Sequence, residues 1–109
     1  MKQGDIIRVN FNPTKGREQA GYRPALVISR TAYNEKRDFV FVCPITGTTK
    51  PLRLRVMLDD RTETQGDVIC EQVRVIDLLA RECKFVERIP KDLLKRVLEA
   101  VSVIIEMEY

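Results

Sequence analysis

Hydrophobic and polar positions divide the 109-residue chain into short strand-like segments followed by one helical segment. Residues 5–11 alternate apolar and polar after Ile7, which is the period of a half-buried strand. Residues 24–29 and 39–45 are short apolar runs, and residues 53–58, 66–70 and 73–76 complete the set of predicted strands. Residues 31–38 fit either one polar helical turn or a loop.

The hydrophobic period changes toward the C-terminal end. Apolar residues recur there at helical spacing and form one wide stripe: Leu93, Leu94, Val97, Leu98, Val101, Ile104 and Ile105. Pro90 suits the first turn of such a helix. Five or six short strands with frequent turns favour a small β-barrel or curled antiparallel sheet. We therefore predict a mainly β fold with a C-terminal helix packed on its outside, in a single domain over residues 1–109.

Charge is unevenly spread along the chain. Residues 1–58 carry eleven Lys and Arg against four Asp and Glu, whereas residues 59–109 carry eight against twelve. A basic first half suits a polyanion such as nucleic acid, although an ordinary mixed surface explains the clustering equally well. No apolar run approaches the ~20 residues that span a bilayer, and the N-terminus has no apolar signal region. We therefore expect a cytoplasmic protein without a membrane partner.

The chain contains no histidine, which removes the commonest general base at neutral pH. Its three cysteines, Cys43, Cys70 and Cys83, have neither disulfide nor zinc spacing, and we expect each to pack as a small hydrophobic residue. The acidic run at residues 59–63 could suggest a metal site, but an exposed loop is the better explanation because the run carries its own arginine. We therefore predict no cofactor and no metal.

Two polar segments could carry chemistry. Residues 15–24 present cations, a carboxylate and an amide between Gly16 and Gly21, and this segment fits either a binding loop or a solvated hairpin loop. Residues 46–50 follow the third strand and offer hydroxyls and backbone N–H groups beside Gly47, as a phosphate site does. A turn whose threonines bond their own backbone is the simpler explanation of this second segment.

Several sequence blocks resemble the MazF/PemK (Kid) toxins. The blocks are Gly4-Asp5-Ile6-Ile7, Asn12-Pro13-Thr14-Lys15-Gly16, residues 18–29, which begin Glu18-Gln19-Ala20-Gly21-Tyr22-Arg23-Pro24, and Glu71-Gln72-Val73-Arg74-Val75-Ile76-Asp77. Their order and spacing match from Gly4 to the C-terminal helix. The chain departs from the Kid-type pattern at Arg17, where those toxins have histidine, and at Ile69, where they have a second catalytic arginine. It is therefore nearer the MazF branch.

The resemblance implies an SH3-like small β-barrel that forms a homodimer and cuts single-stranded RNA without a metal. It implies a cognate antitoxin as partner, and operator DNA as a possible partner of the toxin–antitoxin complex. Catalysis in that family falls on Arg23 and Thr46, with Glu18 as a base in some members. We expect the RNA to contact polar residues of the same blocks and of the neighbouring turn: Lys15, Arg17, Gln19, Tyr22, Thr48, Lys50, Glu71, Gln72 and Arg74.

Aromatic residues could stack an unpaired base, Tyr22 more readily than Phe11, although both also suit packing. Two other functions remain as alternatives. A gyrase-inhibiting toxin of the CcdB type shares the fold but uses a tryptophan near its C-terminus, and this chain has no tryptophan. A non-catalytic SH3-like binding module would not need the polar segment between Glu18 and Arg23.

Overall fold

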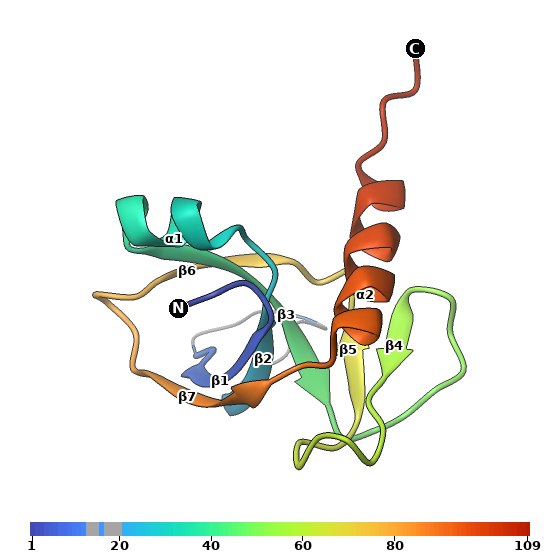
Figure 1. Cartoon of the computed structure of the whole chain (residues 1–109), viewed down its shortest axis with the longest axis horizontal. Coiled ribbons are helices and arrows are strands. Elements are labelled where there is room, and N and C mark those ends of the chain that lie inside the picture. Colours follow the sequence, from blue (N-terminus) through green and yellow to red (C-terminus); the bar gives the residue numbers. More distant parts are fainter. Residues whose placement is uncertain (13–15, 17–20) are drawn as a thin grey trace.

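The computed structural model describes residues 1–12, 16 and 21–109. The described residues form seven strands and two helices (Figure 1). In chain order these are β1 (Asp5–Asn10), β2 (Tyr22–Val27), α1 (Thr31–Arg37), β3 (Phe39–Thr46), β4 (Arg55–Met57), β5 (Asp67–Ile69), β6 (Arg74–Asp77), β7 (Cys83–Arg88) and α2 (Lys91–Ile104).

The strands of the described chain pair antiparallel, in the order β4-β5-β3-β2-β1-β7, with β6 also pairing with β3. Strand β3 pairs with two different strands along one edge: residues 39–42 pair with β6, and Ile45 and Thr46 pair with β5. The sheet therefore curls along β3, with β6 beside its first half and β5 beside its end. This arrangement confirms the predicted curled antiparallel sheet with a C-terminal helix.

The central strands are buried on both faces. Ile6, Leu26 and Cys43 belong to a cluster that also contains Leu93 and Val97 of α2. The opposite face of the same strands supplies a second cluster of buried side chains: Ile7, Val9, Phe11, Ala25, Val27, Val40, Val42 and Ile76. The strand predicted at residues 5–11 to be half-buried is therefore buried on both faces over residues 5–7. Helix α2 packs over the face on which the sequence pattern predicts exposed side chains.

Residues 31–37 form a short helix capped by Asp38, whose φ of 55° is left-handed, so the helical alternative for residues 31–38 is correct. Two details differ from the sequence expectation. The strand expected at residues 53–58 is shorter and covers only Arg55–Met57. Strand β7 was missed because Phe85 and Val86 are exposed and its burial does not alternate.

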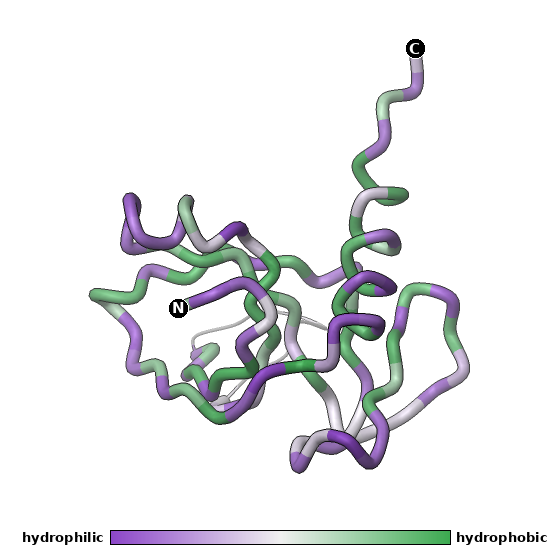
Figure 2. The backbone as a smooth tube through the Cα atoms, viewed as in Figure 1, coloured by the Kyte–Doolittle hydropathy of each residue, from purple (hydrophilic) through white to green (hydrophobic). Residues whose placement is uncertain are grey.

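Helix α2 lies beside β4 and β5, and the residues after it run away from the sheet (Figure 1). The interior strands are predominantly hydrophobic, whereas the loop between β4 and β5 is mostly hydrophilic (Figure 2). Neither helix among the described residues has the length and apolar character needed to cross a membrane.

Candidate functional site

A pocket of about 420 Å³ opens where β1, β2 and the end of β3 meet the loop between β4 and β5. Its lining residues come from all of these elements and from β7: Arg8, Arg23, Pro24, Ile45, Gly47, Glu63, Thr64, Gln65 and Val86. Two arginines and one glutamate give it a positive balance of charge, which favours an anionic ligand.

Arg23 lines this pocket, and Thr46 of the adjacent strand lies between two of its lining residues, Ile45 and Gly47. The register of β2 with β3 pairs Ala25 with Pro44, and continuing it by two residues sets Arg23 opposite Thr46. Side chains opposite each other on neighbouring antiparallel strands lie close enough to act on one ligand. Arg23 is exposed, and Thr46 directly precedes the lining residue Gly47. The structure therefore brings together these two predicted catalytic residues.

The Thr46 hydroxyl is oriented by its own turn. Thr46 is 8% exposed, and its Oγ1 accepts a hydrogen bond from the Thr48 N–H at 3.3 Å. Because a hydroxyl accepts and donates at once, this contact leaves the Thr46 proton available to a ligand oxygen. Thr48 thus contributes its backbone N–H to the site. This contact matches the expectation that the threonines of residues 46–50 bond to their own turn.

Gly66 allows β3 and β5 to approach at this point. Its φ is +121°, and a Cβ at this position would overlap the Thr46 carbonyl oxygen and lie 3.2 Å from the Gly47 Cα. Only glycine fits such a contact and such a backbone conformation. The position of Thr46 therefore depends on the missing side chain at Gly66.

Arg8 is a lining residue that sequence reasoning missed. Its guanidinium carbon lies 5.1 Å from the centroid of the Tyr22 ring, and its Nη2 donates to the Tyr22 carbonyl at 3.2 Å. Tyr22 itself is 39% exposed, so part of its ring is open to solvent. The only sequence signal was a lone cation at the polar position of a strand. The register that places Arg8 opposite Pro24 brings it beside Arg23.

Glu87 of β7 holds the loop between β4 and β5, whose residues Glu63, Thr64 and Gln65 line one side of the pocket. Its carboxylate accepts hydrogen bonds from the Glu63 N–H at 3.0 Å, the Thr64 N–H at 2.8 Å and the Thr64 hydroxyl at 2.7 Å. Burial raises the pKa of Glu87, but the bonds from Thr64 and Glu63 outweigh burial and hold this pKa below its ordinary value. Sequence reasoning gave Glu63, Thr64 and Gln65 no part in the site, and no local pattern signals it.

The same loop is tied to α2 by Arg61. This guanidinium makes an ion pair with Asp59 at 2.8 Å and with Asp92 at 2.9 Å. Its hydrogen bonds hold the pKa of both carboxyl groups below their ordinary values. The acidic run at residues 59–63 is thus an exposed loop with its own cation, as expected. Among the described residues, no group of three or more Cys, Asp or Glu side chains is placed to hold a metal ion.

Glu71, Gln72 and Arg74 lie around a smaller pocket of about 230 Å³, apart from the lining of the first. Arg74 places its guanidinium carbon 4.9 Å from the Phe11 ring centroid and donates to the Phe11 carbonyl at 3.4 Å. Phe11 is fully buried. The suggestion that Phe11 stacks an RNA base is therefore wrong, because the second cluster encloses the ring.

Four predicted site residues, Lys15, Arg17, Glu18 and Gln19, lie outside the described residues. The two ends of that segment are well fixed, as the Phe11 N–H donates to the Gly21 carbonyl and the Gly21 N–H donates to Asn12 Oδ1. Arg81 donates to the Asn12 carbonyl at 2.6 Å. Asn12 and Gly21, which flank this segment, are therefore held together by hydrogen bonds, and Gly21 lies two residues before Arg23.

Lys50 is exposed, and its N–H donates to Asp67 Oδ2 at 2.9 Å. The cysteines pack as expected, with Cys43 and Cys70 buried and Cys83 half-buried. Burial raises the pKa of Cys43 to about 12 and that of Cys70 to about 11, so both remain neutral thiols at pH 7.

The sequence model of one protein family, described as PemK-like, MazF-like toxin of type II toxin–antitoxin system, matches residues 2–105. The chain belongs to this family. Among curated relatives of the PemK/MazF-family toxin, the endoribonuclease PemK of Escherichia coli is 37% identical over 109 residues, covering 96% of this chain and 82% of the relative. The endoribonuclease toxin MazF of Escherichia coli K12 is 42% identical over 78 residues, covering 72% and 69%.

Solved structures agree with this assignment. A crystal structure of MazF from Deinococcus radiodurans superposes with a TM-score of 0.91 at 31% identity, covering 98% of this toxin and 97% of that chain. A MazE–MazF crystal structure from the same organism gives a TM-score of 0.86 at 30% identity, covering 99% and 97%. The resemblance to MazF/PemK toxins and the predicted fold are confirmed, which removes the case for a CcdB-type toxin or a plain binding module.

Proposed function

We propose that this toxin is an endoribonuclease that cleaves single-stranded RNA at short sequences, without a metal, beside Arg23 and Thr46. The observation that carries the proposal is the cross-strand placement of these two residues, with Arg23 lining a positively charged pocket and Thr46 directly before its lining residue Gly47. The curated relatives named endoribonuclease support the same activity. Cleavage of messenger RNA then stops translation and growth.

The chemistry needs no protein nucleophile. The RNA 2′-oxygen attacks the adjacent phosphorus, the O2′–P bond forms and the P–O5′ bond breaks. The leaving 5′-oxygen takes up a proton from water, which gives a 2′,3′-cyclic phosphate and a 5′-hydroxyl. Arg23 binds two phosphate oxygens with its planar fork and stabilises the charge that develops on them. The Thr46 hydroxyl donates to a third oxygen. Glu18 takes the 2′ proton.

Single-turnover cleavage of a short RNA in EDTA tests the mechanism. Arg23→Lys keeps the charge but loses the fork, so we expect cleavage to slow by ~10²–10³ while binding to a 2′-deoxy analogue persists. Thr46→Ala removes one neutral hydrogen bond and should slow cleavage by about tenfold. Glu18→Gln should cost ~10²–10⁴ if Glu18 is the base. Activity that needs magnesium, or an Arg23→Lys rate near wild type, contradicts the mechanism.

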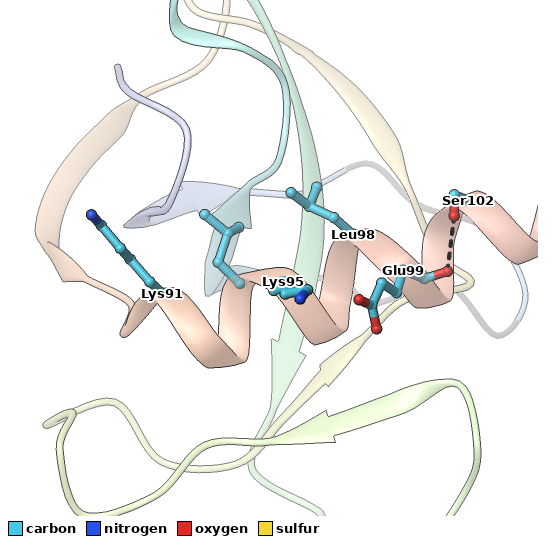
Figure 3. A pocket seen from close by; sticks show the side chains of 6 residues that line it. Lys91, Lys95, Leu98, Glu99 and Ser102 are labelled. Carbon is cyan, nitrogen blue, oxygen red and sulfur yellow. Dashed lines mark hydrogen bonds between the residues drawn. The ribbon is translucent and has the colours of Figure 1, made fainter.

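We also propose a symmetric homodimer that uses α2. The helix carries a shallow pocket of about 450 Å³ whose lining combines apolar and polar side chains: Lys91, Leu94, Lys95, Leu98, Glu99 and Ser102 (Figure 3). Val103, Ile104 and Ile105 are exposed beyond it. Apolar surface of this kind is normally covered by a partner. Sedimentation at micromolar concentration should give a dimer, and Leu98→Lys should give a monomer. A wild-type monomer contradicts the proposal.

A cognate antitoxin is the proposed protein partner, supported by the similarity to the MazE–MazF crystal structures. In the dimer, Lys50 lines an RNA groove that crosses both subunits; Lys15 and Arg17, the other basic residues expected to contact the RNA, lie outside the described residues. The toxin acts in the cytoplasm, and its complex with the antitoxin binds operator DNA. Inhibition of RNA cleavage by the purified antitoxin, and a DNA gel shift seen only with both proteins, test these partners.

A further inference from the structure

Beside the pocket lies a buried ion pair that the proposed reaction does not use. Asp67, the first residue of β5, is 1% exposed, and its Oδ2 lies 3.5 Å from Nη1 of Arg55, which is 15% exposed. The remaining atoms are poorly satisfied, because Arg55 Nε and Asp67 Oδ1 are buried without a hydrogen-bond partner among the described residues. Such a pair is a weak source of stability, since desolvation offsets the attraction between its charges.

The pair holds the turn that follows Thr46. Arg55 Nη1 donates to the Thr48 carbonyl at 2.8 Å, and Asp67 Oδ2 accepts from the Lys50 N–H at 2.9 Å. The two charges thus anchor Thr48 and Lys50, both in the first half of the segment between β3 and β4. Hydrogen bonds to charged groups are stronger than neutral ones, so these contacts restrict the turn more than its own backbone bonds do.

Sheet register links the pair to Thr46 itself. Strand β5 lies between β3 and β4, where Asp67 is opposite Thr46 on one side and Met57 on the other. Residues opposite one another share a face of the sheet, and Arg55 shares that face because it precedes Met57 by two residues. The Thr46 hydroxyl and the Asp67 carboxylate therefore project from the same side of the sheet.

We propose that Arg55 and Asp67 are positioning residues that set the Thr46 hydroxyl for the phosphate of the substrate. This inference rests on the proposed function of Thr46. Burying the two charges has a desolvation penalty that apolar side chains would avoid. The hydrogen bonds that the pair makes go to Thr48 and Lys50, in the turn that follows Thr46. Misplacing a catalytic group by about 1 Å costs on the order of 10²-fold in rate.

The test replaces both charges at once. Arg55→Met with Asp67→Val removes every orphaned atom, so the melting temperature should equal or exceed that of the wild type. Single-turnover cleavage should nevertheless fall by up to about tenfold, the loss expected for Thr46→Ala, with binding of a 2′-deoxy RNA unchanged. In a Thr46→Ala background the same double substitution should change the rate by no more than about twofold, because coupled residues do not contribute additively.

A matched control uses the other ion pair with a buried aspartate. Arg88 Nη1 lies 3.0 Å from Oδ1 of Asp5, whose side chain is 8% exposed, and neither residue lines the pocket. Arg88→Met with Asp5→Val should leave the cleavage rate unchanged. Asp67→Asn is a second, milder variant that keeps an acceptor for Lys50 but loses the attraction to Arg55, and it should also slow cleavage.

Four results would overturn the inference. The double variant cleaves at the wild-type rate; it slows cleavage equally with and without Thr46; it melts well below the wild type; or the control pair slows cleavage as much. A Thr46→Ala variant as fast as the wild type would remove the proposed role of Thr46 and this inference with it. A slow Thr46→Ala variant with a fast Arg55/Asp67 double variant removes the inference alone.

Discussion

Replacing Gly66 by alanine places a methyl group against the backbone of the active pocket. The new Cβ would overlap the Thr46 carbonyl oxygen and lie 2.8 Å from its carbonyl carbon. Because non-bonded carbon contacts are most favourable near 3.5–4 Å, β3 and β5 must separate by about 1 Å. That movement also strains the hydrogen bond from the Leu58 N–H to the Gly66 carbonyl, now 2.8 Å long.

Two contributions set the size of the effect. A residue with a side chain held at a sparsely populated positive φ costs about 1–3 kcal/mol, and overpacking against a fixed neighbour costs about another 1–3 kcal/mol. The free energy of unfolding should therefore fall by about 2–6 kcal/mol. At about 4 °C per kcal/mol for a domain of this size, the melting temperature should fall by roughly 8–24 °C.

Gly21→Ala separates the two contributions. Gly21 has a φ of +82°, but no heavy atom of the described residues lies within 4 Å of the position its new methyl group would take, so only the conformational cost applies. Urea unfolding of both variants measures the difference directly. Gly66→Ala should lose about 1–3 kcal/mol more than Gly21→Ala, and its cleavage rate should fall because Thr46 moves. Equal losses in the two variants would refute the idea that close approach at Gly66 sets the position of Thr46.

Three further substitutions test other parts of the pocket. Arg8→Met should weaken binding of a 2′-deoxy RNA and reduce the slope of log affinity against log salt by about 0.7, as expected for one lost phosphate contact on a single strand. Gly47→Ala should leave the melting temperature unchanged, since no atom in the described part of the chain lies within 4 Å of the added methyl, yet slow cleavage by narrowing the pocket. Glu87→Gln should lower the free energy of unfolding by about 1 kcal/mol at pH 7. Because folding lowers the Glu87 pKa, this contribution is present above the ordinary carboxyl pKa and is lost as the pH falls through the lowered one, so the two proteins should converge in acid unfolding curves.

Hydrophobic periodicity was a good guide to the parts of the fold that are buried on a regular pattern. The C-terminal stripe predicted α2, because Leu93 and Val97 contact the sheet at the spacing of one helical face. It could not predict β7, whose pairing with β1 depends on backbone hydrogen bonds and includes an irregularity between Ile6 and Ile7. An edge strand with exposed Phe85 and Val86 has no distinctive local pattern.

The candidate site was predictable where one short block carries it. Arg23 and Thr46 were found through family blocks and a turn motif, and the register of β2 and β3 then explains why they meet. Arg8 was missed because it lines the pocket only through the pairing of β1 with β2, which its own segment of the sequence does not reveal. Glu63, Thr64 and Gln65 were missed because their loop reaches the pocket only through Glu87, which lies more than twenty residues away in the chain.

Strand β5 explains how so small a sheet can hold a chemical site without an imidazole. The Thr46 hydroxyl and the Arg23 guanidinium act on the phosphate through their positions, so the reaction depends on how rigidly they are held. Gly66 brings β5 against Thr46, and Asp67 restricts the turn after it. Both residues are adjacent in the chain and both touch the end of β3. A chain that holds its phosphate-binding groups in this way should therefore lose activity through substitutions at Gly66 and Asp67 that never touch the RNA.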